Sequence, residues 1–355
     1  DRYASVADWR EAIRLGLQAV ATGTTPVAAP PALFKAPPAP PTPLLGRDEI
    51  LADAVERLKG TTRILTLTGV GGTGKTRFAI ELFHRLHRDY AGGAAFVSLA
   101  SVTDATEVLP TISTTLDIAE AHGRSALDAI ATVIGDRQFR LVLDNLEQVV
   151  DAAGDVAALV ARCPGLKVVA TSRRPLKVGA ESELALPPLD LPAAGVIEAD
   201  ELMLCPSVAL FVQRAARVKP GFALSPANAV SVAGICRSLD GLPLALELAA
   251  ARVRVLEPAA LLQRLDHALD LLTSGDRDLP LRQRTLRATI SWSYSLLAPE
   301  EQRTLRRLSV FHEGWTFEGM EGVCYAADER GRALDELESL VEKGLVRVIG
   351  GGDRY

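Results

Sequence analysis

The sequence predicts an α/β fold in which a parallel-sheet domain precedes a small helical domain. In the first half, strand-like runs alternate with helical patterns, which is typical of βαβ units and a parallel sheet. Over residues 205–275 the strand-like runs stop, and apolar residues recur every three or four positions. A glycine-rich turn follows the first strand-like run and leads into a helical pattern, within residues 65–82, LTLTGVGGTGKTRFAIEL.

Size and composition describe an ordinary globular protein. At 355 residues, with 48% hydrophobic and 23% charged residues, the chain is long enough for two or three domains. A net charge of −5 argues against a broad nucleic-acid-binding face, and no apolar run approaches the length of a membrane span. The scattered cysteines have no metal-ligand spacing, and we expect a cytoplasmic protein. Because the chain runs from Asp1 to Tyr355 and stops inside a strand-like run, we interpret it as a piece of a longer protein.

The first 43 residues predict a connection between domains. Apolar residues recur at helical spacing near the start, so residues 1–25 are interpreted as the helical tail of an upstream domain. Residues 26–43 are rich in proline, which fixes φ and lacks a backbone donor, and they predict an extended, semi-rigid linker. We favour this linker over a partner-binding proline motif.

The predicted parallel-sheet domain spans residues 44–190. Its strand-like runs are apolar and separated by helical patterns: 63–69, 93–99, 139–145, 166–172 and 182–189. A linker follows at residues 191–204, and the helical domain spans residues 205–280. Residues 281–355 are again helical and rich in arginine, and they end in a short strand-like run with a glycine turn.

The glycine-rich turn predicts a phosphate site. Residues 69–76 satisfy the pattern G-x-x-x-x-G-K-[ST] between a strand and a helix. Four glycines let backbone N–H groups turn toward phosphates: Gly69, Gly71, Gly72 and Gly74. The helix that begins near Lys75 adds its positive dipole. Lys75 would reach the β- and γ-phosphates, and the Thr76 hydroxyl would coordinate Mg²⁺. The alternative is a glycine-rich βα turn with a chance lysine.

A second feature supports this site. The apolar run FRLVLDN reaches Asp144, whose carboxylate could meet the Mg²⁺ ion beside Thr76. The alternative is that Asp144 caps the next helix. Hydrolysis also needs a group that orients water, and the next position holds Asn145, whose amide cannot usefully accept a proton. Glu147 is the nearest acid, so the choice between Asn145 and Glu147 stays open, and we expect slow turnover.

Two arginines follow the run LKVVATS. An arginine at the end of a parallel strand lies where ligands bind in such sheets, and its planar, permanently charged guanidinium suits a γ-phosphate. Two adjacent arginines cannot both point inward, so we assign the sensing role to Arg173, with solvated surface charge as the alternative. Lys75, Asp144 and Arg173 are thus the expected catalytic residues.

These segments resemble the STAND class of P-loop NTPases, which includes the NB-ARC ATPases and many bacterial regulators, over residues 44–355. PLLGRDE (43–49) is similar to the class's hydrophobic-Gly-Arg-x-Glu motif, although its acids are Asp48 and Glu49. Further matches are TGVGGTGKTR for the phosphate loop, LVLDNLEQV for the magnesium strand, ATSRRPL for the sensor strand and GLPLALELAA (241–250) for the Gly-Leu-Pro motif. RQRTLRATISWSYSLLAPEEQRTLRRLSVF (282–311) looks like the winged-helix segment of bacterial members. The resemblance implies a P-loop NTPase parallel sheet followed by a small helical domain and a truncated winged-helix domain at residues 281–355.

The resemblance also implies ligands, roles and partners. ATP or ADP with Mg²⁺ would be held by the adenine-pocket residues Leu45, Arg47 and Pro243, by the metal-site residues Thr76 and Asp144, and by the loop residues Gly69, Gly71, Gly72, Thr73, Gly74, Lys75, Thr76 and Arg77. Members of the class bury ADP in a closed off-state, open on exchange for ATP and often oligomerise. The implied partners are an upstream effector, which can be DNA-binding, and a downstream sensor. No membrane and no direct nucleic-acid contact are expected for this piece.

Two other functions stay open. An actively hydrolysing AAA-type ATPase would turn over rapidly and would use an arginine supplied by a neighbouring subunit. A DNA-binding module would act through residues 281–311, which carry a basic cluster: Arg282, Arg284, Arg287, Arg303, Arg306 and Arg307.

Overall fold

The computed structural model describes most of the chain beyond its first 32 residues. It covers residues 33–86, 89–119, 124–193, 195–196, 198–265, 290–291, 294, 297–311, 314–326, 328–343, 345–346, 348 and 354–355. The chain divides into two compact units, Asp1–Leu33 and Phe34–Tyr355. The predicted helical tail at residues 1–25 lies outside the described residues, as do Arg282, Arg284 and Arg287.

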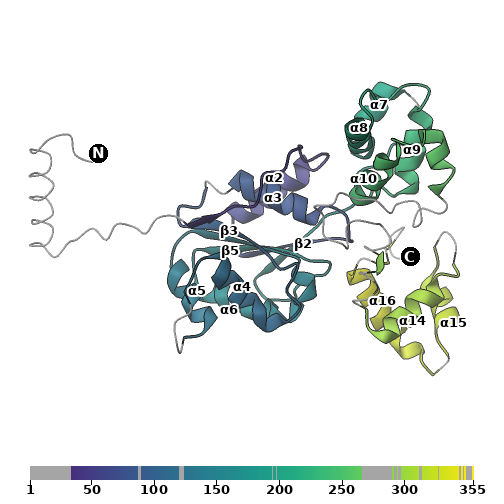
Figure 1. Ribbon diagram of the computed structural model, residues 1–355. Helices are drawn as coiled ribbons and strands as arrows, with labels where there is room; N and C mark the ends of the chain where they lie inside the picture. The colour runs from purple at the N-terminus through teal and green to yellow at the C-terminus, as the bar shows by residue number, and fades with distance from the viewer. Residues whose placement is uncertain are drawn as a thin grey trace, which may run out of the picture. The chain divides into compact units, whose positions relative to one another are not determined.

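A six-stranded sheet with the order β1-β3-β4-β5-β2-β6 forms the first part of the larger unit (Figure 1). Neighbouring strands from β3 to β6 in this order are parallel, which confirms the predicted sheet. The strands are β1 Leu33–Lys35, β2 Ile64–Thr68, β3 Gly93–Ser98, β4 Phe139–Asp144, β5 Leu166–Thr171 and β6 Glu181–Ala185. All residues of β2 and β4 are buried, as expected of central strands covered on both faces.

Two strands differ from the predicted runs. β6 ends at Ala185 rather than at residue 189, because Pro187 and Pro188 have no N–H to donate to a ladder. The segment expected to be only a proline-rich linker contains β1, which lies beside β3 at the edge of the sheet. Edge positions tolerate nearby prolines, because one side of an edge strand needs no ladder hydrogen bonds.

Helices cover both faces of the sheet (Figure 1). On one face, α2 Asp48–Lys59 and α3 Lys75–Leu86 bury their apolar stripes against β2, with Leu58, Leu67 and Phe78 in one core. The other face carries α4 Val108–Thr115, α5 Ala126–Ile134 and α6 Ala153–Arg162. The remaining short 3₁₀ turns of this region are η2 Ala105–Glu107, η3 Leu146–Gln148 and η4 Val150–Ala152.

A second apolar core belongs to a helical region, as the sequence predicts. Its helices are α7 Ala199–Met203, α8 Pro206–Val218, α9 Ala229–Ser238, α10 Pro243–Arg252 and α11 Pro258–Leu262. Three of them start with proline at a first-turn position, where the missing N–H would have no intrahelical partner. One of these helices, α10, starts at Pro243, which the resemblance assigns to the adenine pocket.

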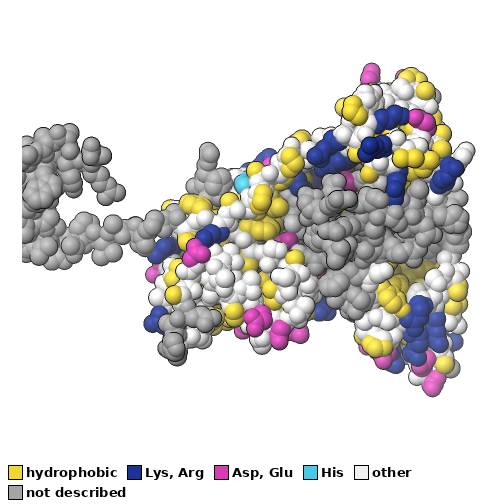
Figure 2. Space-filling view, viewed as in Figure 1, with side chains coloured by type: hydrophobic (Ala, Val, Ile, Leu, Met, Phe, Trp, Pro, Cys, Tyr) yellow, Lys and Arg dark blue, Asp and Glu magenta, His cyan; other side chains and the backbone are white. Residues whose placement is uncertain are grey.

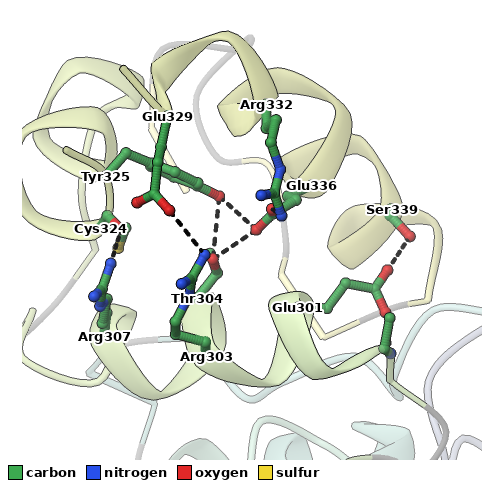
Figure 3. A network of polar contacts seen from close by, with 11 residues as sticks. Glu301, Arg303, Thr304, Arg307, Cys324, Tyr325, Glu329, Arg332, Glu336 and Ser339 are labelled. Atoms are coloured by element: carbon green, nitrogen blue, oxygen red, sulfur yellow. Dashed lines mark hydrogen bonds and ion pairs between the residues drawn. The ribbon is translucent and has the colours of Figure 1, made fainter. Parts of the chain in front are cut away.

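A third core joins α14 Pro299–Leu308, α15 Phe317–Cys324 and α16 Ala333–Glu342, with the 3₁₀ turn η7 Arg330–Arg332 before α16. A polar network ties these helices together (Figure 3). The hydroxyls of Thr304 and Tyr325 donate to Oε2 of Glu336 at 2.6 and 2.8 Å, and Arg332 pairs with Oε1 of Glu336 at 2.8 Å. The expected strand-like run near residue 350 lies largely outside the described residues, so the winged helix stays a prediction.

The arginines of α14 are bonded within this third region, although Lys and Arg side chains gather visibly on its surface (Figure 2). Arg303 pairs with Glu329 at 3.4 Å, Arg306 donates to the Tyr294 hydroxyl, and Arg307 donates to a backbone carbonyl. These contacts engage three of the six arginines considered for DNA binding.

In the described part of the chain, no helix combines the length and apolar character needed to cross a bilayer.

Candidate functional site

The candidate site lies at the carboxyl edge of the sheet, where ligands of parallel α/β folds bind. β5 lies between β4 and β2. The segments that follow these three strands therefore converge at one edge: the glycine-rich loop after β2, Asp144 to Glu147 at the end of β4, and Arg173 after β5.

The loop between β2 and α3 has a backbone conformation that requires its glycines. Gly69, Gly72 and Gly74 have φ values of +148°, +87° and +92°, a region that L side chains rarely adopt. A Cβ on Gly72 would lie 3.0 Å from Cβ of Leu244, and the Gly72 carbonyl accepts a hydrogen bond from Leu244 N at 3.2 Å. The glycine-rich loop is therefore in backbone contact with the first turn of α10.

Lys75 begins α3, as predicted, and is buried. Its Nζ donates to the carbonyls of Gly69 at 2.7 Å and Val70 at 3.1 Å, so the ammonium lies over the loop. Burial lowers the pKa of Lys75 to about 8; the carboxylate of Glu147 opposes this shift and the guanidinium of Arg173 adds to it. Burial makes the charged form of this ammonium less stable, and an anionic ligand beside it would stabilise that form.

Asp144 ends β4 and accepts two hydroxyl hydrogen bonds at Oδ1, from Thr76 at 2.8 Å and from Thr171 at 2.7 Å. Burial raises the pKa of Asp144, while both hydroxyl bonds oppose the shift. The next helical turn, η3, has no side-chain cap bond, which disfavours the alternative that Asp144 is a helix cap. A carboxylate and a hydroxyl oxygen in contact are ligand types that Mg²⁺ prefers.

Arg173 and Glu147 form a buried ion pair in this site. Nε of Arg173 lies 3.6 Å from Oε1 of Glu147, and the two side chains are 10% and 7% exposed. Between Asp144 and Glu147 the chain turns at Asn145, which has a φ of +68° and donates its N–H to Oγ1 of Thr171 at 2.8 Å. Asparagine is one of the few residues that adopt this conformation readily, so position 145 has a backbone reason to be asparagine.

A cavity of about 360 Å³ opens beside the loop, within the size range of small-molecule sites. The predicted site residues that line it are Leu45, Arg47, Gly71, Gly72, Thr73, Gly74, Lys75, Thr76, Arg77, Arg173 and Pro243. Gly69 and Asp144 are not among the lining residues; Gly69 contacts Lys75, and Asp144 contacts Thr76. Apolar side chains form another part of the wall: Leu44, Leu45, Leu189, Leu210, Pro243 and Leu244.

The segment that precedes α2 is fixed between the sheet region and the helical region. Arg47 is 5% exposed and donates to the Pro187 carbonyl; burial lowers its pKa, and Asp190 opposes that shift. Gly46 has a φ of +60°, and a Cβ there would lie 2.4 Å from the Pro206 ring. A larger residue at position 46 would therefore displace the start of α8.

Sequence reasoning missed a polar cluster at the cavity wall. Nε of Arg214, on α8, donates to Oε1 of Glu247, on α10, at 2.9 Å, and its terminal nitrogens lie 3.4 and 3.5 Å from Oγ1 of Thr42. The Thr42 carbonyl also accepts from Arg77 of α3. Glu247 could have been found, because it lies four residues after Pro243 and thus on the same helix face. Arg214 carries no comparable signal.

The residues present fit a nucleotide with a divalent cation. The apolar wall suits a base, the glycine loop and Lys75 suit phosphates, and Thr76 with Asp144 suits Mg²⁺. Lys75 and Arg173 line the cavity and supply positive charge, and Asp144 accepts a hydrogen bond from the Thr76 hydroxyl.

Comparisons with known proteins show which proteins this chain is similar to. Residues 47–181 match the model of the NB-ARC domain. A putative HTH-type transcriptional regulator of Mycobacterium tuberculosis (strain H37Rv) is 39% identical over 291 residues, which cover 81% of this chain and 31% of that protein. The chain thus spans about a third of that regulator's length.

Two further proteins are similar over a larger share of their own length. An uncharacterized protein of the same M. tuberculosis strain is 35% identical over 310 residues, covering 86% of this chain and 76% of that protein. Among solved structures, a Signal Transduction ATPase with Numerous Domains (STAND) protein with a tetratricopeptide repeat sensor, from Pyrococcus horikoshii, is 17% identical. The match has a TM-score of 0.39 and covers 92% of this chain and 42% of that one.

Proposed function

This chain belongs to the STAND-class P-loop NTPases that carry an NB-ARC domain, and we propose that it is an adenine-nucleotide switch of a signalling or transcriptional regulator. ADP holds the closed off-state, and ATP favours an open state that can oligomerise. Hydrolysis is slow and resets the switch.

One observation carries the proposal: a single cavity is lined by residues of both the sheet region and the helical region. The glycine loop and Lys75 come from the first, and Pro243, Arg214 and Glu247 come from the second. A ligand in this cavity contacts both regions at once. Its binding free energy therefore depends on their relative arrangement.

The physical basis is a population shift. A ligand moves a two-state equilibrium only by the difference in its affinity for the two states. ADP binds best where α10 closes on the cavity through Pro243, with the predicted winged helix of residues 281–355 as a further wall. The γ-phosphate of ATP adds negative charge beside Arg173, and a different arrangement then becomes favourable.

The regulator context comes from the relatives. Because a relative is named an HTH-type transcriptional regulator, we propose that an upstream effector and a downstream sensor accompany this piece in the full-length protein. The ligand of the sensor would promote exchange of ADP for ATP. Mg²⁺ would be held by Thr76 and Asp144.

Nucleotide affinities and turnover on the purified protein test the switch. We expect distinct ADP and ATP affinities in the wild type and slow steady-state phosphate release. Arg173→Ala should mainly reduce the discrimination between ADP and ATP, because the proposal assigns the contact with the γ-phosphate to the Arg173 guanidinium. Equal affinities in the wild type would remove the basis of the proposal. Rapid turnover would favour the AAA-type ATPase instead.

A further inference from the structure

Glu147 is a buried carboxylate in the cavity to which the proposed switch assigns no part. Its side chain is 7% exposed and lines the same cavity as Lys75 and Arg173. Within the described part of the chain, its Oε2 atom is buried without a hydrogen-bond partner. Buried polar atoms are rarely left without a partner, so this oxygen indicates a place for a ligand group or a bound water.

The other polar groups at the end of β4 are less suited to receive a proton from water. Oδ1 of Asp144 already accepts hydrogen bonds from Thr76 and Thr171, and Asp144 is not among the residues that line the cavity. Asn145 lines it, but an amide is not a base. Among the groups at the end of β4, Glu147 is therefore the carboxylate that has both access to the cavity and an oxygen without a hydrogen bond.

We propose that Glu147 is the general base for the water that attacks ATP, and that its ion pair with Arg173 restrains it until a γ-phosphate takes over the guanidinium. The inference rests on the proposed function, because it names the catalytic group and its regulation at the same site.

The reaction step balances with water as the only co-reactant. A lone pair of the water oxygen forms a bond to the γ-phosphorus, while the bond from that phosphorus to the β–γ bridging oxygen breaks and leaves its electron pair on that oxygen. Glu147 takes the proton that the water loses and returns it to the phosphate product. The products are ADP and inorganic phosphate.

The ion pair explains why turnover is slow and coupled to nucleotide state. With Oε1 of Glu147 and Nε of Arg173 at 3.6 Å, the ion pair holds the carboxylate against the guanidinium, so the carboxylate is not free to orient an attacking water. A γ-phosphate competes for the same guanidinium. Glu147 is thus released only when ATP, and not ADP, fills the cavity.

Glu147→Gln tests the assignment, because the amide keeps the size of the side chain but cannot accept the proton. Single-turnover hydrolysis of labelled ATP should slow by about a hundredfold or more. The variant should bind ATP at least as tightly as the wild type, because Arg173 no longer has a competing carboxylate. Protein incubated with ATP, then denatured, should release ATP from the variant and ADP from the wild type. Asp151→Asn is the matched control, since Asp151 is exposed and lies outside the cavity.

Two further variants test whether Glu147→Gln acts by misfolding the protein and whether the Asn145 amide is the group that acts on the water. Glu147→Gln combined with Arg173→Gln removes both buried charges and should still bind ATP without hydrolysing it. Asn145→Gly removes the rival amide and keeps the left-handed backbone accessible. The assignment would be overturned if Glu147→Gln hydrolysed ATP at the wild-type rate. It would also be overturned if Asn145→Gly lost hydrolysis while Glu147→Gln kept it. A parallel loss of ATP affinity in Glu147→Gln would also overturn it, because that result indicates a structural counterion. Failure of the wild type to bind ATP would instead refute the proposed function, and this inference with it.

Discussion

At the residue scale, Lys75 is a buried ammonium whose charge depends on its ligand. Its ammonium is buried against the loop carbonyls of Gly69 and Val70, and its pKa is lowered to about 8 by that burial. A phosphate beside it favours the charged form and raises the pKa again. Protonation of Lys75 and nucleotide binding are therefore linked.

This linkage predicts a pH dependence. Below pH 8, Lys75 is already charged in the free protein, so nucleotide affinity should be at its full value. Above pH 8 the free protein must take up a proton to bind, so affinity should fall, by at most about tenfold per pH unit. Isothermal calorimetry at pH 8.5 in two buffers of different ionisation enthalpy measures the proton uptake. An affinity that stays constant from pH 7 to 9.5, without proton uptake, would show that Lys75 does not contact the phosphates.

At the element scale, α8 and α10 bring the helical region to the cavity. Arg214 and Glu247 form a pair across these two helices, and Arg214 also contacts Thr42, whose carbonyl accepts from Arg77 of α3. This chain of polar contacts connects Arg77, which follows Thr76 in α3, with the helical region. It gives the phosphate loop a side-chain connection to α8 and α10, in addition to the backbone bond from Leu244 to Gly72.

The polar chain predicts that Arg214→Ala accelerates ADP release. The change removes the contact to Thr42 and leaves the Glu247 carboxylate without its partner, so closure of the helical region on the cavity is weakened. Stopped-flow release of a fluorescent ADP analogue measures the rate. Arg217→Ala is the matched control, because Arg217 is exposed on the same helix and does not line the cavity. Equal rates for both variants would mean that the polar chain does not retain ADP.

The sequence predicts those elements that are determined by neighbouring residues, and it does not predict contacts between residues that are far apart in the chain. Local patterns predict β2, β4 and β5, the glycine loop and the start of α3 near Lys75, because strand hydrophobicity and glycine spacing are properties of adjacent residues. The pairing of Arg173 with Glu147 and the cluster of Arg214, Glu247 and Thr42 are tertiary contacts without a sequence period. The sequence does not predict β1, which lies within a proline-rich stretch, because its three residues form a strand only by pairing with β3 at the edge of the sheet.

At the scale of the whole molecule, the described part of the larger unit contains separate apolar cores, among them those of the sheet region, the helical region and the region of α14, α15 and α16. Two of them contribute to the walls of the cavity: Leu44 and Phe78 belong to the sheet core, and Leu45 and Leu189 belong to the helical core. A protein built from separate cores can change the arrangement of its parts without unfolding any of them. The nucleotide would supply the free energy that selects one arrangement.

The central claim is that this cavity binds one adenine nucleotide. The most direct test is calorimetric titration of nucleotide-depleted, folded protein with ADP and Mg²⁺, and with ATP and Mg²⁺, beside Lys75→Ala. We predict saturable binding of one nucleotide per chain in the wild type and none in the variant. Absence of binding heat with both nucleotides in folded wild-type protein, across two temperatures, would contradict the account.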